Sequence, residues 1–98
     1  MINLNKNFLI YGYGVSGKSV SKYLSNKNCK YSIFDDFKKL TKVKNVISKV
    51  ILKEKLKLFD YIVISPSIKI DKKHILYNYK KKIIIDLDLL SNELSKQL

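Results

Sequence analysis

The sequence contains three glycines, and all of them lie in one short segment, Gly12-Tyr13-Gly14-Val15-Ser16-Gly17. This segment matches the pattern G-x-G-x-x-G, in which the first glycine allows a tight turn, the second a close approach to phosphate, and the third helix–strand packing. An apolar run at residues 8–11 precedes it and an amphipathic stretch follows it. Since a helix N-terminus offers free N–H groups and a partial positive charge, the segment predicts a phosphate-binding turn.

The same segment permits a second interpretation. With Lys18 and Ser19 it also fits G-x-x-x-x-G-K-[ST], the pattern of an ATP-binding phosphate loop. In that case Lys18 would contact terminal phosphates and Ser19 would bind magnesium. The internal Gly14, together with the acidic residue Asp35 after the next apolar run, favours the dinucleotide-type turn instead. A tight turn that binds no ligand is the remaining alternative.

Two adjacent carboxylates, Asp35 and Asp36, follow the apolar run at residues 31–34. Neighbouring side chains of an extended backbone point in opposite directions, so we do not expect a general acid–base pair. One of the two can accept hydrogen bonds from a ribose or a base, and we expect the other to be solvated. We expect the one histidine, His74, at a solvated helix position. No catalytic triad or metal-binding cluster is visible in the sequence.

The elements that must position these residues alternate along the chain. Apolar runs predict five strands, at residues 8–11, 31–34, 49–52, 61–64 and 83–85. Helical spacing predicts a helix at residues 17–26, a second capped by Asp71, and a last one capped by Asp86 that carries Leu87, Leu90 and Leu94. This order is typical of an α/β fold, an open, mostly parallel five-stranded Rossmann-like sheet with helices on both faces. Ligands of such sheets bind at the carboxyl ends of the strands.

The chain has 98 residues, which suits a single domain, and its formal net charge is +12. Such a charge can indicate a nucleic-acid or membrane partner, but all 20 basic residues are lysines and they are spread along the chain. Surfaces that recognise phosphates usually include Arg, whose guanidinium binds in a bidentate manner. Because Lys, Asn, Ile and Tyr share AT-rich codons, base composition explains the excess. We therefore expect no nucleic-acid and no membrane partner.

Cellular location can also be predicted. The N-terminal residues show no signal-peptide pattern, and the apolar runs are far shorter than a membrane span. The single Cys29 fits a reducing compartment. We expect a cytoplasmic protein.

Four segments in this order resemble the N-terminal domain of the Mur ligases: residues 11–19, 34–36, 60–68 and 85–90. That family shows a G-x-G-x-[ST]-G turn, an aspartate ending the second strand, the sequence S-P-G-[IV] after a later strand, and D-[IL]-[ED]-L opening the last helix. The similarity covers almost the whole chain, and it is strongest to the UDP-N-acetylmuramoylalanine–D-glutamate ligases. Two departures are Ser67 and Ile85, where the family usually has glycine.

The resemblance implies that the chain binds the UDP part of UDP-N-acetylmuramoyl-L-alanine during peptidoglycan synthesis. Gly14, Val15 and Ser16 would face the diphosphate, the segment 35–37 would lie beside the uracil, and two serines would close the pocket. The full set of substrate-binding residues would be Gly12, Gly14, Val15, Ser16, Gly17, Asp35, Asp36, Phe37, Ser65 and Ser67.

In the same family, ATP and Mg²⁺ are bound by a central domain, and D-glutamate is bound by a C-terminal domain. We expect residues 1–98 to be the N-terminal domain alone, without cofactor, metal site or catalytic residue, and therefore inactive as a ligase by itself. The alternative is a small NAD(P)-binding Rossmann module with a regulatory or oxidoreductase function.

Overall fold

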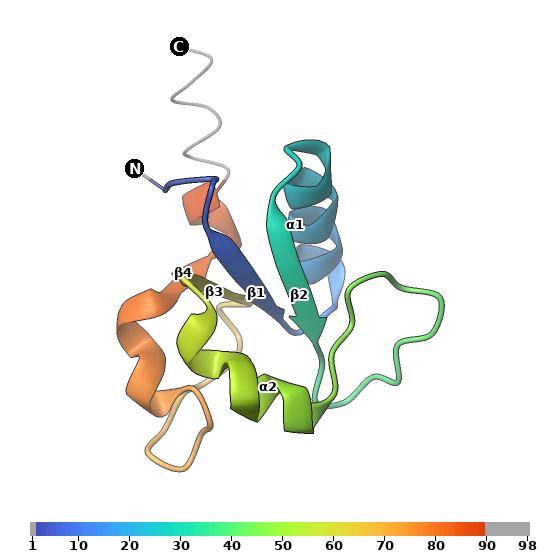
Figure 1. Cartoon of the computed structure of the whole chain (residues 1–98). Coiled ribbons are helices and arrows are strands. Elements are labelled where there is room, and N and C mark those ends of the chain that lie inside the picture. Colours follow the sequence, from blue (N-terminus) through green and yellow to red (C-terminus); the bar gives the residue numbers. More distant parts are fainter. Residues whose placement is uncertain (1, 90–98) are drawn as a thin grey trace.

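The computed structural model describes residues 2–89 (Figure 1). The elements follow in the order β1 (Asn7–Tyr11), α1 (Val15–Asn26), β2 (Lys30–Phe34), α2 (Lys49–Lys55), the 3₁₀ helix η1 (Leu56–Leu58), β3 (Tyr61–Ile64), the 3₁₀ helix η2 (Tyr77–Lys82) and β4 (Ile83–Ile85). Residues 86–89 are helical.

The four strands form one parallel sheet in the order β2-β1-β3-β4. The α/β class and the parallel arrangement are therefore confirmed, as are four of the five predicted strands. β2 and β3 lie on opposite sides of β1. The connection from β1 to β2 therefore runs to one side of β1, and the next connection crosses back to β3 on the other side. The crevice between β1 and β3 is thus a topological switch point, where ligands of open α/β sheets bind.

Alternate residues of each strand face opposite sides of the sheet, and helices cover both sides (Figure 1). Phe8 and Ile10 pack with Val20 and Leu24 of α1. The other side of β1 packs with residues of α2, η1 and the segments around β3, namely Leu52, Leu56, Phe59 and Leu76. The prediction of helices on both faces is confirmed.

The predicted strand at residues 49–52 is wrong, because this segment forms α2. The side chain of Ser48 accepts a hydrogen bond from the Ile51 N–H and caps the helix. Leu52 is fully buried, whereas Val50 is 67% exposed. A buried strand would put these two side chains on the same face, so the burial pattern is that of a helix. Beside β2, a strand-like pairing exists only as one bridge between Ile33 and Val46 within residues 2–89.

The predictions for the helices after Asp71 and after Asp86 also need correction in their type or their cap. Asp71 accepts a hydrogen bond from the Lys73 N–H within a turn, and the helical segment that follows is η2. In the last helix Asp86 is already helical, and it is Asp88 that accepts the Ile85 N–H at 2.8 Å. Asp88 therefore caps this helix from inside its first turn. Leu90 and Leu94 lie outside the described residues.

Between residues 2 and 89, no helix combines the length and the apolar character that crossing a membrane requires.

Candidate functional site

A cavity of about 730 Å³ opens at the carboxyl ends of β1, β2 and β3, beside the switch point. Its volume lies in the range of small-molecule binding sites, roughly 300–1,000 Å³. Its wall includes every residue that the sequence suggested for substrate binding: Gly12, Gly14, Val15, Ser16, Gly17, Asp35, Asp36, Phe37, Ser65 and Ser67. The structure brings these residues together, and their contact with a ligand stays a prediction.

The turn after β1 depends on glycine at its first position. Gly12 has a φ angle of +101°, which residues with a side chain rarely adopt. Its N–H donates to the carbonyl of Phe34 at 2.7 Å, so the turn continues the pairing of β1 with β2. The tight turn predicted at this position is therefore present.

The other two glycines differ in what surrounds them. A Cβ atom on Gly17 would lie 2.2 Å from the carbonyl oxygen of Gly12, so α1 could not pack this closely on the turn. A Cβ atom on Gly14 would meet no atom of the protein within 4 Å. The fold therefore requires glycine at position 17, whereas at position 14 the surroundings of the backbone are open, and Gly14 lines the cavity.

The N-terminus of α1 faces this open space. The helix begins at Val15 with Gly14 as its N-cap, and it has neither a side-chain cap nor an acidic residue in its first turn. The first N–H groups of any helix have no partner within the helix, and they carry its positive end. Val15, Ser16 and Gly17 thus present the positive end of the helix to the cavity.

This geometry argues against the ATP-loop interpretation. The helix starts at Val15, so Lys18 and Ser19 already lie beyond its first residues. Both side chains are exposed, and neither contributes to the cavity wall. The positions of Lys18 and Ser19 therefore do not support the ATP-loop interpretation.

Asp35 joins the loop after β2 to the glycine turn. One carboxylate oxygen accepts the Tyr13 N–H at 2.7 Å, and the other accepts the N–H groups of Phe37 and Lys38, each at 2.8 Å. Burial alone would raise the pKa of Asp35, but these three donors and the charge of Lys38 outweigh it and hold the pKa below its ordinary value. Asp35 is thus an anion that organises the backbone on two sides of the cavity.

Asp36 is exposed and accepts a hydrogen bond from the hydroxyl of Tyr11. Burial is the main cause that raises the pKa of Tyr11, followed by this hydrogen bond and the charges of Asp36 and Asp35. The Tyr11 ring packs against Phe34 on one side and His74 on another, with ring centres 5.5 and 5.4 Å apart. The hydrogen-bonded pair of Asp36 and Tyr11 therefore lines the cavity with polar atoms, and the rings of Phe34 and His74 hold Tyr11 in place.

His74 does not lie at a solvated helix position, as the sequence suggested. It is half-buried in the turn before η2 and lines the cavity. Its Nδ1 accepts the Leu76 N–H at 3.1 Å, so in the neutral ring the proton is on Nε2. The sequence placed His74 on a helix capped by Asp71, but this segment is a turn, and the turn brings the side chain to the cavity.

The loop after β3 forms the opposite wall. The hydroxyls of Ser65 and Ser67 lie 3.0 Å apart, and the Ile68 N–H donates to the Ser65 carbonyl at 3.0 Å in a turn. Ser67 is not among the described residues with positive φ, so its backbone does not require the glycine that the Mur ligases usually have there.

Besides Tyr11 and His74, the wall contains four residues outside the ten suggested for binding: Tyr13, Lys38, Ile68 and Lys69. Tyr13 and Ile68 lie inside motifs that the sequence shows, and Lys38 and Lys69 directly follow them. Proximity to those motifs was the only signal that the sequence offered for them.

Comparison with models of protein families identifies a family for this chain. A sequence model described as "Mur ligase MurD-like, N-terminal domain" matches residues 6–86, which is most of the chain. Searches of curated proteins and of solved structures found no significant match.

Proposed function

The chain belongs to the family of MurD-like N-terminal domains of Mur ligases, and from this premise we propose that it binds UDP-N-acetylmuramoyl-L-alanine through the UDP group. Mur ligases build the peptide of peptidoglycan on a UDP-sugar, so the substrate carries both a nucleobase and a diphosphate. The proposal assigns the glycine turn to the diphosphate and the loop after β2 to the uracil.

The observation that carries the proposal is the open space at Gly14. No atom of the protein lies within 4 Å of a Cβ built there, and the backbone conformation is extended rather than left-handed. Neither a steric contact nor a left-handed backbone therefore explains why this position lacks a side chain. A phosphate that approaches the backbone and accepts hydrogen bonds from the N–H groups at the start of α1 would explain the glycine.

The uracil end is supported by the residues after β2. Phe37 lines the cavity, yet 97% of its side chain is exposed, so a face of its ring is free to stack on a base. The exposed carboxylate of Asp36 lies on the same wall and can accept the N–H of a uracil ring. Asp35 contributes by holding this loop against the glycine turn.

We propose further that the complete enzyme adds D-glutamate to UDP-N-acetylmuramoyl-L-alanine and that it acts in the cytoplasm. ATP and Mg²⁺ would supply the activation of the substrate carboxyl in the complete enzyme. The proposal gives this chain the UDP-binding role and no catalytic step.

Calorimetric titration of the chain with UDP and with NADH tests the proposal. We expect saturable UDP binding that Gly14→Val abolishes, because the new side chain fills the space assigned to the phosphate. Gly14→Val must keep the circular-dichroism spectrum and melting temperature of the original chain for the comparison to count. NADH binding without UDP binding would contradict the proposal and support the NAD(P)-module alternative.

A further inference from the structure

Lys38 places a positive charge beside the peptide unit at which α1 begins. Its Nζ donates a hydrogen bond to the Tyr13 carbonyl at 3.3 Å, and that carbonyl belongs to the same peptide unit as the Gly14 N–H. The side chain also lines the cavity. An ammonium group has three N–H donors, so Lys38 keeps donors for a second partner.

The position of this lysine is fixed from its own backbone. The Lys38 N–H donates to Asp35 at 2.8 Å, and the other oxygen of Asp35 accepts the Tyr13 N–H at 2.7 Å. Asp35 and Lys38 therefore hold Tyr13 at its N–H and at its carbonyl. The loop after β2 and the glycine turn form one unit that carries the ammonium group into the cavity.

An ammonium group beside a helix N-terminus is unfavourable unless an anion is present, because the helix end is itself positive. The first turn of α1 contains no acidic residue that could compensate. The nearest carboxylates on the wall already have partners, since Asp35 accepts three backbone N–H groups and Asp36 accepts the Tyr11 hydroxyl. The charge of Lys38 acts on Asp35, but no hydrogen bond among the described residues joins its ammonium group to either carboxylate, so its remaining donors are open to an anionic ligand.

We propose that Lys38 binds the diphosphate directly and makes the site selective for nucleotides over nucleosides. This inference rests on the proposed UDP function and adds to it the cation that recognises the phosphates. On binding, the ammonium group uses its remaining donors for phosphate oxygens while the Tyr13 contact keeps it in place. Charge-assisted hydrogen bonds of this kind are stronger than neutral ones, so the effect is measurable.

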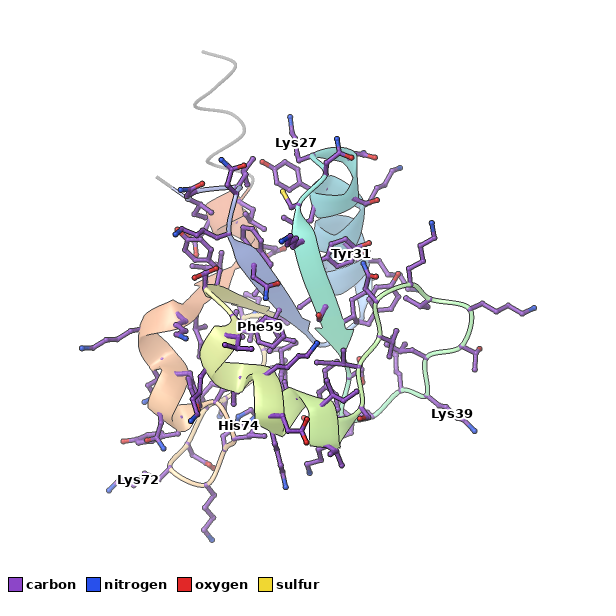
Figure 2. The ribbon with its side chains drawn as sticks, viewed as in Figure 1. Lys27, Tyr31, Lys39, Phe59, Lys72 and His74 are labelled. Atoms are coloured by element: carbon purple, nitrogen blue, oxygen red, sulfur yellow. The ribbon has the colours of Figure 1, made fainter. Side chains whose placement is uncertain are left out.

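The experiment compares Lys38→Met with Lys39→Met. Lys39 is the next residue, carries the same charge, is exposed and points away from the protein without lining the cavity (Figure 2). Both variants and the original chain are titrated with UDP and with uridine at two salt concentrations. Lys38→Arg serves as the conservative variant.

We expect Lys38→Met to weaken UDP binding roughly tenfold and to reduce its salt dependence, with uridine binding unchanged. Lys39→Met should stay within about twofold of the original chain, since an exposed distant charge is screened, and Lys38→Arg should restore most of the UDP affinity. Equal losses for UDP and uridine in Lys38→Met would show that Lys38 only supports the turn, and this would overturn the inference. Unchanged UDP binding in Lys38→Met would overturn it as well, while leaving the proposed function intact. If the original chain bound no UDP, the proposed function itself would fail.

Discussion

At the scale of single residues, the glycine turn separates what the fold needs from what a ligand needs. Gly12 is required by its positive φ angle and Gly17 by the closeness of the Gly12 carbonyl. Gly14 has neither constraint. Two of the three glycines are therefore explained by the chain itself, and the third is explained by the proposed phosphate.

This difference predicts unequal outcomes for two alanine substitutions. Gly17→Ala should lower the free energy of unfolding by about 1–3 kcal/mol, because the methyl group must displace backbone rather than a flexible side chain. Gly14→Ala should lower it by less, because its extended backbone and open surroundings accept a methyl group and only the preference of an N-cap for glycine over alanine is lost. Urea unfolding of both variants checks this. A comparable loss in Gly14→Ala would mean that the fold also needs this glycine.

Asp35 predicts how stability depends on pH. The pKa of Asp35 is lower in the folded chain than its ordinary value of 3.8. The stabilisation that its charge contributes is therefore fully present above pH 3.8, and it is lost as the pH falls through the pKa of the folded chain. Asp35→Asn should therefore be less stable than the original chain at neutral pH, and the difference should shrink below about pH 4.

Unfolding free energies measured at neutral pH and at several acidic pH values test this dependence. Glu54→Gln, which neutralises an exposed carboxylate on α2, is the matched control and should show no such convergence. A constant difference between Asp35→Asn and the original chain at all pH values would contradict the role given to the Asp35 charge.

At the scale of elements, α2 shows how a short apolar run can be misassigned. The run Val50-Ile51-Leu52 suits a buried strand by composition, but only Leu52 is fully buried. Its partner on the buried face is Leu56, four residues later, and Ser48 caps the start. The segment covers one side of the sheet instead of extending it.

The two assignments differ in a measurable way. In a helix, Leu52→Ala should cost about 2–5 kcal/mol of unfolding free energy, because a fully buried side chain is removed. Val50→Ala should be neutral or slightly stabilising, since the position is exposed and alanine favours helices. Thermal or urea unfolding of the two variants measures both effects. Similar large losses at both positions would indicate the strand.

At the scale of the whole molecule, strand order decides where the site lies. The arrangement β2-β1-β3-β4 brings the ends of three strands and the start of α1 to one crevice. The net charge of +12 surrounds this crevice with a field that favours an anionic ligand. The lysine excess would thus assist the proposed nucleotide ligand.

The sequence by itself determined the glycine turn, four strands of the sheet and the α/β class. These features follow from local preferences: the left-handed conformation at Gly12, the apolar runs of β1 and β3, and the acidic residues after β2. The ten suggested binding residues also come together around one cavity. They do so because the carboxyl ends of parallel strands share an edge, which strand alternation alone implies.

Only the tertiary structure decided the roles of α2, His74 and Lys38. Whether residues 49–52 pair with a strand or cover the sheet depends on which side chains the rest of the chain buries. His74 lies in a turn where a helix was predicted and Lys38 lies in a loop, and their place on the cavity wall depends on partners distant in sequence, such as Tyr11 and Tyr13. Local patterns specify elements, whereas contacts between loops arise only after the strand order has brought their ends together.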